Sequence, residues 1–233
     1  MFFSRRLFIA LTPLVLGVAL AACGGNGSNG STRSAAERDD DMAMGDPKAP
    51  IVVIEYASLT CPHCADFHEE IFPELKKKYI DTGKVRFVFR QFPTPPVPYA
   101  VGGEAVARCA GPDKYFDLLD ILYAKQRYWV TSNNPRKALM EMAATAGISQ
   151  ADFDACVSDE ANIKRIQEVS KLAQEEFKIT GTPSFVINGK LRPRVRTLES
   201  FEEIFNPILG IKPEPKPAPE ADVKPAAEQG EDH

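Results

Sequence analysis

The segment IVVIEYASLTCPHC, residues 51–64, is the most informative part of this 233-residue chain for its fold and chemistry. Its first half is an apolar run that predicts a buried strand, and the apolar residues after Cys64 have helical spacing. Cys61 then lies at a helix start, where unpaired N–H groups and the helix dipole favour an anion such as a thiolate. Pro62 suits the first helical turn, and a protonated His63 adds positive charge. Because the thiolate is the reactive form of cysteine, this corner indicates thiol–disulfide chemistry.

Residues 1–22 resemble an export signal peptide, in which arginines precede an apolar stretch too short to span a bilayer comfortably. The sequence LAAC ending at Cys23 resembles the lipobox of bacterial lipoproteins. We therefore expect lipidation of Cys23, membrane anchoring, and a location in the periplasm or cell envelope. An ordinary signal peptide with a coincidental cysteine is the alternative. The segment also resembles a twin-arginine signal, so the export route stays open.

Composition separates the folded region from its flanks. Residues 23–42 predict a flexible linker, and residues 211–233 form a Pro/Glu/Lys/Ala-rich tail that cannot bury a core. One domain over residues 43–210 remains, which we expect to be monomeric. The formal net charge of −4 is not basic enough to indicate a nucleic-acid partner.

The order of predicted elements follows from patterns outside the decisive segment. Residues 84–92 alternate β-branched and aromatic side chains and predict a second strand. Residues 97–178 contain helical periodicity and no convincing strand. Strand character returns at 183–187 and, after an Asn-Gly hairpin turn, at 190–195. Thr197 is expected to cap a final helix.

The strand–CPHC–helix unit, the downstream Thr182-Pro183 pair and the closing hairpin and helix together resemble the thioredoxin fold. The helical block resembles the insertion of its DsbA-like branch. The resemblance covers residues 43–210. It implies an α/β thioredoxin fold with an inserted helical subdomain at about residues 97–178.

The resemblance also assigns roles to the CPHC motif. Cys61 corresponds to the more exposed, nucleophilic thiol, and Cys64 to the resolving thiol one turn further in. Pro62 and His63 are expected to tune the Cys61 thiolate. No cofactor besides this redox-active disulfide is implied.

Three further residues acquire roles in the same way. Pro183 corresponds to a cis proline that faces the disulfide, with Thr182 before it presenting backbone groups to an extended substrate. Glu55 resembles the buried glutamate that handles protons near the resolving thiol. The alternative for Glu55 is a solvated charge at a strand edge.

Cys109 and Cys156 form an even set with the motif cysteines once Cys23 is set aside, as expected in an exported protein. Similar paired cysteines occur in some DsbA-like relatives. We therefore expect a structural disulfide between Cys109 and Cys156. Two buried free thiols, or a second redox-active pair, are the alternatives.

The remaining histidine and aromatic side chains are expected to be structural rather than functional. A zinc site would need two ligands besides the motif cysteines, and no metal is expected. His68 is predicted to be an exposed helix residue. The aromatic residues of the helical block, with Trp129 also a candidate for the border of a peptide groove, are expected in the core: Tyr115, Phe116, Tyr128 and Trp129.

The family resemblance implies that the protein donates disulfides to exported proteins with free thiols through the Cys61–Cys64 pair. A quinone-linked membrane protein of the DsbB or VKOR kind would then reoxidise it. A disulfide isomerase or reductase of the same fold is one alternative. A non-catalytic envelope lipoprotein that only binds a partner is another.

Overall fold

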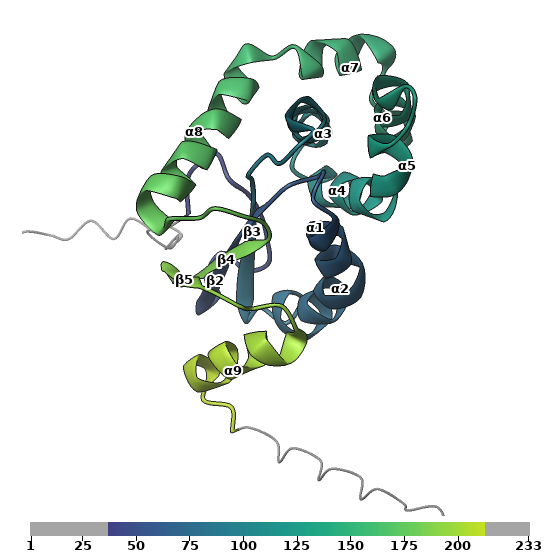
Figure 1. Ribbon diagram of the computed structural model, residues 1–233. Helices are drawn as coiled ribbons and strands as arrows, with labels where there is room; N and C mark the ends of the chain where they lie inside the picture. The colour runs from purple at the N-terminus through teal and green to yellow at the C-terminus, as the bar shows by residue number, and fades with distance from the viewer. Residues whose placement is uncertain (1–36, 213–233) are drawn as a thin grey trace, which may run out of the picture. The chain divides into compact units, whose positions relative to one another are not determined.

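The computed structural model describes residues 37–212. Within them, a five-stranded sheet with the order β1-β3-β2-β4-β5 is flanked by helices (Figure 1). β2 and β3 are parallel, and the other neighbouring strands are antiparallel. The strands are β1 (Met42–Met44), β2 (Ile51–Ala57), β3 (Val85–Gln91), β4 (Ser184–Ile187) and β5 (Lys190–Arg192).

A long helical segment follows β2 and runs without a break from Pro62 to Ile80. Two of its parts, η1 and η2, are wider π-helical turns. Pro73, which has no N–H to donate, lies just after η1. The parts are α1 (Pro62–Asp66), η1 (Phe67–Ile71), α2 (Phe72–Leu75) and η2 (Lys76–Ile80).

The predicted helical block contains helices and no strand within the described part of the chain. Its α6 and α7 begin where Asn134 and Ser149 accept hydrogen bonds from backbone N–H groups. Thr197 caps the last helix, as expected. The helices are α3 (Val97–Cys109), α4 (Tyr115–Ala124), α5 (Gln126–Val130), α6 (Pro135–Thr145), α7 (Gln150–Val157), α8 (Glu160–Phe177) and α9 (Leu198–Leu209).

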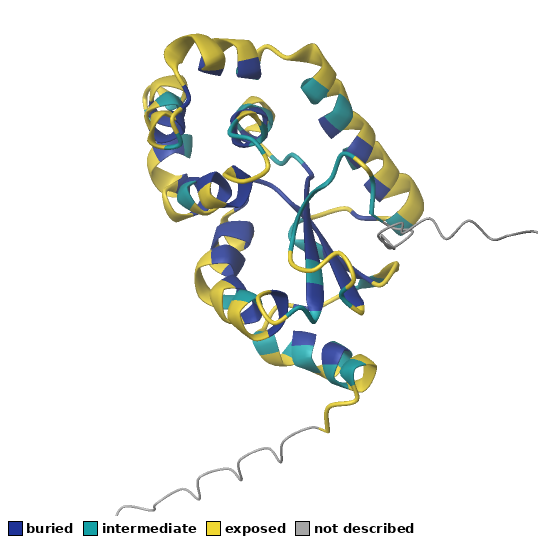
Figure 2. Ribbon diagram, turned by 180° about the vertical axis from the view of Figure 1, so that it is seen from behind, coloured by how far each residue is buried: buried dark blue, intermediate teal, exposed yellow. Residues whose placement is uncertain are grey.

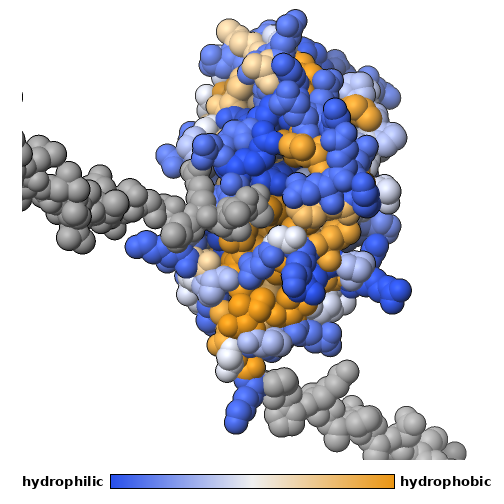
Figure 3. Space-filling view, turned by 90° about the vertical axis from the view of Figure 1, so that its left-hand side faces the viewer, coloured by the Kyte–Doolittle hydropathy of each residue, from blue (hydrophilic) through white to orange (hydrophobic). Residues whose placement is uncertain are grey.

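Side chains of the central strand β2 alternate between two cores. Val53 packs in the cluster that includes the long helix, α9 and much of the helical block. Ile54 packs on the opposite face against Val169 of α8. Buried residues accordingly face the sheet in Figure 2. The surface seen from the α8 side carries hydrophobic areas among hydrophilic ones (Figure 3).

Strand pairing brings two distant segments to one edge of the sheet. Tyr56 near the end of β2 pairs with Ser184 at the start of β4, because these strands are antiparallel. The CPHC motif begins just after β2, and Pro183 directly precedes β4. The topology therefore places the motif beside Pro183.

The folded region begins earlier than the sequence predicts. Part of the expected linker 23–42 packs against the sheet, and its last residue, Met42, starts β1. The Asp41 carboxylate accepts hydrogen bonds of 2.7 and 2.9 Å from the Arg90 guanidinium on β3. An ion pair between residues 49 positions apart produces no pattern in the local sequence that could predict it.

Other boundaries differ only slightly from those predicted. The second strand is one residue shorter at each end than residues 84–92. The return strand expected over residues 190–195 ends at Arg192, because Pro193 cannot donate to a neighbouring strand. The proposed signal peptide, Cys23, the linker before residue 37 and the tail from residue 213 lie outside the described residues.

Candidate active site

Cys61 occupies the corner between β2 and α1. Its backbone is extended, with φ −86° and ψ 120°, and Pro62 fills the first helical turn. The Cys61 carbonyl accepts hydrogen bonds from the N–H groups of Cys64 at 3.1 Å and Ala65 at 3.3 Å. Both motif cysteines are free thiols, and Cys61 is 8% exposed against 0% for Cys64. Only Cys61 is therefore open to attack from outside.

The two thiols have opposite acidities. A hydrogen bond from the Cys64 thiol, assisted by backbone N–H groups of Cys64 and His63, lowers the pKa of Cys61 to about 5. Burial opposes this change without cancelling it. Burial, the hydrogen bond to Cys61 and the charge of Glu55 raise the pKa of Cys64 well above its ordinary value. One thiolate and one thiol therefore coexist at neutral pH.

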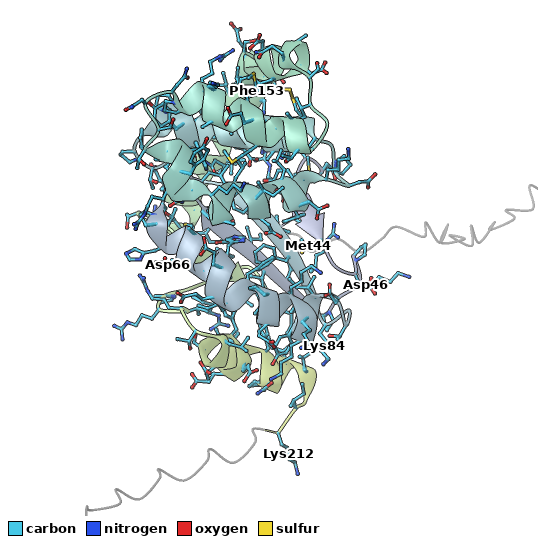
Figure 4. The ribbon with its side chains drawn as sticks, turned by 90° about the vertical axis from the view of Figure 1, so that its right-hand side faces the viewer. Met44, Asp46, Asp66, Lys84, Phe153 and Lys212 are labelled. Carbon is cyan, nitrogen blue, oxygen red and sulfur yellow. A yellow bond between two sulfur atoms is a disulfide. The ribbon has the colours of Figure 1, made fainter. Side chains whose placement is uncertain are left out.

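His63 contributes through its backbone rather than its ring. The ring is exposed, and its Nδ1 lies 3.4 Å from Oδ2 of Asp66. Asp66 lies at the surface of α1, at the outer edge of the molecule in Figure 4. The expected tuning by a protonated His63 beside the sulfur is replaced by its N–H group at the helix start.

The Thr182–Pro183 peptide bond is cis, as the family resemblance implied. The Cys61 sulfur lies 3.5 Å from the Thr182 carbonyl oxygen, to which the thiol donates when it is protonated. A cavity of about 180 Å³ lies beside this contact, with His63, Pro183 and Arg196 in its lining. The segment before β4 therefore presents its backbone directly to the reactive sulfur.

Glu55 is completely buried, as its expected role requires. Its Oε2 lies 2.8 Å from Nε2 of His68, so the prediction of an exposed His68 is wrong. His68 follows Cys64 by four residues and lies on the same inward face of the helix. Burial alone would lower the pKa of His68, but Glu55 and Asp120 raise it to about 9.

Gln126 joins the helical block to the motif, a contact that sequence analysis missed. Its side-chain amide donates to the carbonyl oxygens of Leu59 at 3.1 Å and Cys61 at 2.9 Å. More than sixty residues separate these partners, so no local signal exists. For His68, by contrast, the four-residue spacing from Cys64 was a usable signal.

A disulfide joins Cys109 of α3 to Cys156 of α7, with a Cα–Cα distance of 6.1 Å. This is the pairing that the family resemblance implied. It lies in the helical block near Phe153, where Figure 4 shows the sulfur atoms. The bridge is within the insertion rather than in the CPHC motif, which agrees with a structural role.

The aromatic residues of the helical block are mostly core, as expected. Trp129 is fully buried, and its indole N–H donates to the Leu122 carbonyl, as in a core residue; it also lines an apolar cavity of about 460 Å³ among the helices of the insertion. Tyr115 and Phe116 are also buried. The prediction for Tyr128 is wrong, because this residue is 59% exposed.

No cluster of three or more His, Cys, Asp or Glu side chains within residues 37–212 has the arrangement of a metal site. No helix in this range is long and apolar enough to cross a membrane.

Known proteins resemble this chain over most of the described region. A thioredoxin family model matches residues 37–206. The crystal structure of Wolbachia pipientis alpha-DsbA1 is 32% identical, with a TM-score of 0.69, over 75% of this chain and 93% of that one. Disulfide bond formation protein D of Bacillus subtilis is 27% identical over 71% of this chain and 74% of its own length.

A Rickettsia prowazekii protein that bears the name of a protein-disulfide oxidoreductase is 36% identical over 152 residues. The match covers 65% of this chain but only 55% of that relative, so the chain spans about half of its length. The family model and the Wolbachia structure, by contrast, extend over nearly the whole described region. The chain therefore belongs to the thioredoxin family and, within it, to the DsbA-like branch.

Proposed function

We propose that the chain is a thiol:disulfide oxidoreductase that donates the Cys61–Cys64 disulfide to exported proteins. The observation that carries this proposal is the opposite change in the two thiol pKa values. With a pKa of about 5, roughly 99% of Cys61 is thiolate at pH 7. No cofactor besides the cysteine pair takes part.

The first exchange step begins with the oxidised protein. A substrate thiolate attacks Cys61 Sγ, the Cys61–Cys64 bond breaks, and a substrate–Cys61 disulfide forms. The electron pair of the broken bond leaves on Cys64, which takes up a proton because its pKa is raised. The greater exposure of Cys61 supports attack at this sulfur.

The second step releases the product. A second substrate thiolate attacks the substrate sulfur of the mixed disulfide, and Cys61 leaves as a thiolate. A thiol of low pKa is a good leaving group, so the Cys61 environment favours this step. The substrate is oxidised by two electrons, and the cysteine pair is reduced by two.

The direction of exchange follows from which state is stabilised. Hydrogen bonds to the Cys61 thiolate exist only in the reduced protein, and a stabilised reduced form makes the disulfide a stronger oxidant. This supports an oxidase over an isomerase or reductase. The Thr182 carbonyl beside Cys61 supports docking of an extended substrate segment.

The remaining parts of the proposal come from the N-terminal sequence and the family. The protein acts as a monomer in the periplasm or cell envelope, and lipidation of Cys23 anchors it to a membrane. A quinone-linked membrane protein of the DsbB or VKOR kind reoxidises Cys61 and Cys64.

The proposal is tested by two measurements on the purified protein. Thiolate absorbance against pH gives the Cys61 pKa, and equilibration with glutathione gives the redox potential. We expect a midpoint near pH 5 and a potential more oxidising than that of the glutathione pool. A potential near that of thioredoxin would instead indicate a reductase.

Trapping of mixed disulfides with substrate, in variants that lack one motif cysteine, identifies which sulfur reacts. Cys64→Ala should accumulate mixed disulfides through Cys61, because the resolving thiol is absent. Cys61→Ala, the matched control, should accumulate none. Equal trapping by the two variants would contradict the assignment of Cys61 as the nucleophile, and trapping by neither would favour a non-catalytic binding protein.

A further inference from the structure

We propose that His68 and Asp120 connect buried Glu55 to solvent and form the route by which Cys64 gains and loses its proton. This inference rests on the proposed exchange chemistry of the Cys61–Cys64 pair. It adds two positioning residues, one of them from the helical block, to that chemistry.

The route begins at a carboxylate sealed inside the protein. Glu55 and Cys64 are both 0% exposed, and the Glu55 charge acts on the Cys64 thiol. Glu55 Oε2 contacts His68, whereas its Oε1 is buried without a hydrogen-bond partner among the described residues. Because no hydrogen bond from these residues occupies Oε1, this oxygen is assigned as the acceptor of the Cys64 proton.

The route ends at the surface. His68 Nδ1 lies 3.9 Å from Asp120 Oδ1 on α4, and the Asp120 side chain is 54% exposed while that of His68 is 1% exposed. A separation of 3.9 Å is longer than a hydrogen bond, but an exposed carboxylate can rotate to close it. Asp120 thus joins a buried imidazole to bulk water.

Rings enclose His68 on its other sides. Tyr123 stacks on the imidazole with ring centroids 4.3 Å apart, and Phe72 lies at 4.8 Å. The edges of Phe67 and Phe89 complete the enclosure. These rings offer no carboxylate or amine, so the polar exit runs through Nδ1.

The titratable residues in contact with His68 are Glu55 from β2 and Asp120 and Tyr123 from α4, and Cys64 lies one turn earlier in the same helical segment. Tyr123 does not compete as a proton carrier, because burial raises the pKa of its hydroxyl well above the ordinary value. The pKa of His68, about 9, keeps the imidazole protonated and paired with Glu55.

Protons balance along this route. When Cys64 ionises, its proton passes to Glu55 Oε1, and His68 releases its Nδ1 proton through Asp120 to water. The Glu55–His68 pair holds the same number of protons before and after: Glu55 is left protonated at Oε1, and His68 is left neutral with its remaining proton on Nε2, facing Oε2. The reverse sequence protonates Cys64 when it leaves the disulfide.

The experiment uses the chromogenic disulfide dithiobisnitrobenzoate and the reduced protein in stopped flow. The Cys61 thiolate attacks the reagent and releases one coloured thiolate, at a rate that depends on reagent concentration. The Cys64 thiolate then attacks Cys61 Sγ of the mixed disulfide and releases the second, at a rate independent of reagent concentration. The first phase tests the proposed function, and the second tests this inference.

We compare His68→Gln and Asp120→Asn with Asp117→Asn, an exposed acid on the same helix that serves as the matched control. General acid–base catalysis contributes at least about 100-fold, so His68→Gln should slow the second phase by about that factor at pH 7. Asp120→Asn should slow it by about 10-fold, since water partly replaces a surface carboxylate. Asp117→Asn should change neither phase.

The pH profile separates proton transfer from structural damage. The deficit of both test variants should shrink as pH rises, because hydroxide then removes the Cys64 proton, while the first phase stays within about threefold of wild type. A second phase unchanged in Asp120→Asn and His68→Gln, or a deficit independent of pH, overturns the inference. A wild-type protein without the first phase would refute the proposed function itself.

Discussion

The Cys61 thiolate should make the stability of the reduced protein depend on pH, and Cys61→Ser isolates this dependence. The serine hydroxyl has a similar size but does not ionise in the experimental range. The oxidised protein has no thiolate at this position and provides a second reference. Titrating groups that do not contact Cys61 contribute equally to wild type and variant, and Cys64, whose pKa is raised, stays protonated at acid and neutral pH.

The size of the effect follows from the two pKa values of Cys61. Hydrogen bonds from Cys64 and the backbone hold the folded value at about 5, against 9.0 for an ordinary thiol. A pKa lowered by folding stabilises the protein above the unfolded value, and this stability is lost as pH falls through the folded value. At pH 7 the thiolate adds about 3 kcal/mol to the free energy of unfolding, and at pH 4 almost nothing.

Urea unfolding of both reduced proteins at pH 7 and pH 4 measures this contribution. The difference in unfolding free energy between wild type and Cys61→Ser should shrink by about 3 kcal/mol between pH 7 and pH 4. A difference that stays constant to within about 1 kcal/mol would show that folding does not stabilise the Cys61 thiolate.

Three further predictions concern the scaffold, each measured by urea unfolding. Replacing Cys109 and Cys156 by alanine should cost about 4 kcal/mol by chain entropy, because the bridge spans 47 residues; a loss below about 1 kcal/mol would contradict this. Gln126→Leu should cost about 1–3 kcal/mol, since the Leu59 carbonyl loses its side-chain donor, and an unchanged stability would argue against that contact. Asp41→Ala should cost about 1–3 kcal/mol, because the buried Arg90 guanidinium loses two hydrogen bonds to the carboxylate, and an unchanged stability would argue against those contacts.

Local patterns were sufficient to predict the corner that carries the reactive thiols. The apolar run of β2, Pro62 at the helix start and the helical spacing after Cys64 are all neighbours in sequence. The cis bond at Pro183 and the Cys109–Cys156 bridge came from family resemblance, since neither can be derived from spacing.

Contacts between distant segments could not be predicted. The Asp41–Arg90 pair joins residues 49 positions apart, and Gln126 reaches the Cys61 carbonyl across 65 positions. The error at His68 has a different origin. A histidine on a helix is usually taken as solvent-facing, but this one lies opposite a buried carboxylate that satisfies its ring nitrogen.

The contacts of α4 and α5 with the motif have a consequence for protein engineering. Asp120 and Gln126 belong to the helical block, yet they touch His68 and the backbone of the CPHC corner. Deleting residues 97–178 to obtain a minimal redox module would expose the buried side of the candidate active site to solvent. Helices α4 and α5 are therefore part of the candidate active site. Attempts to graft or shorten the helical block should retain both helices.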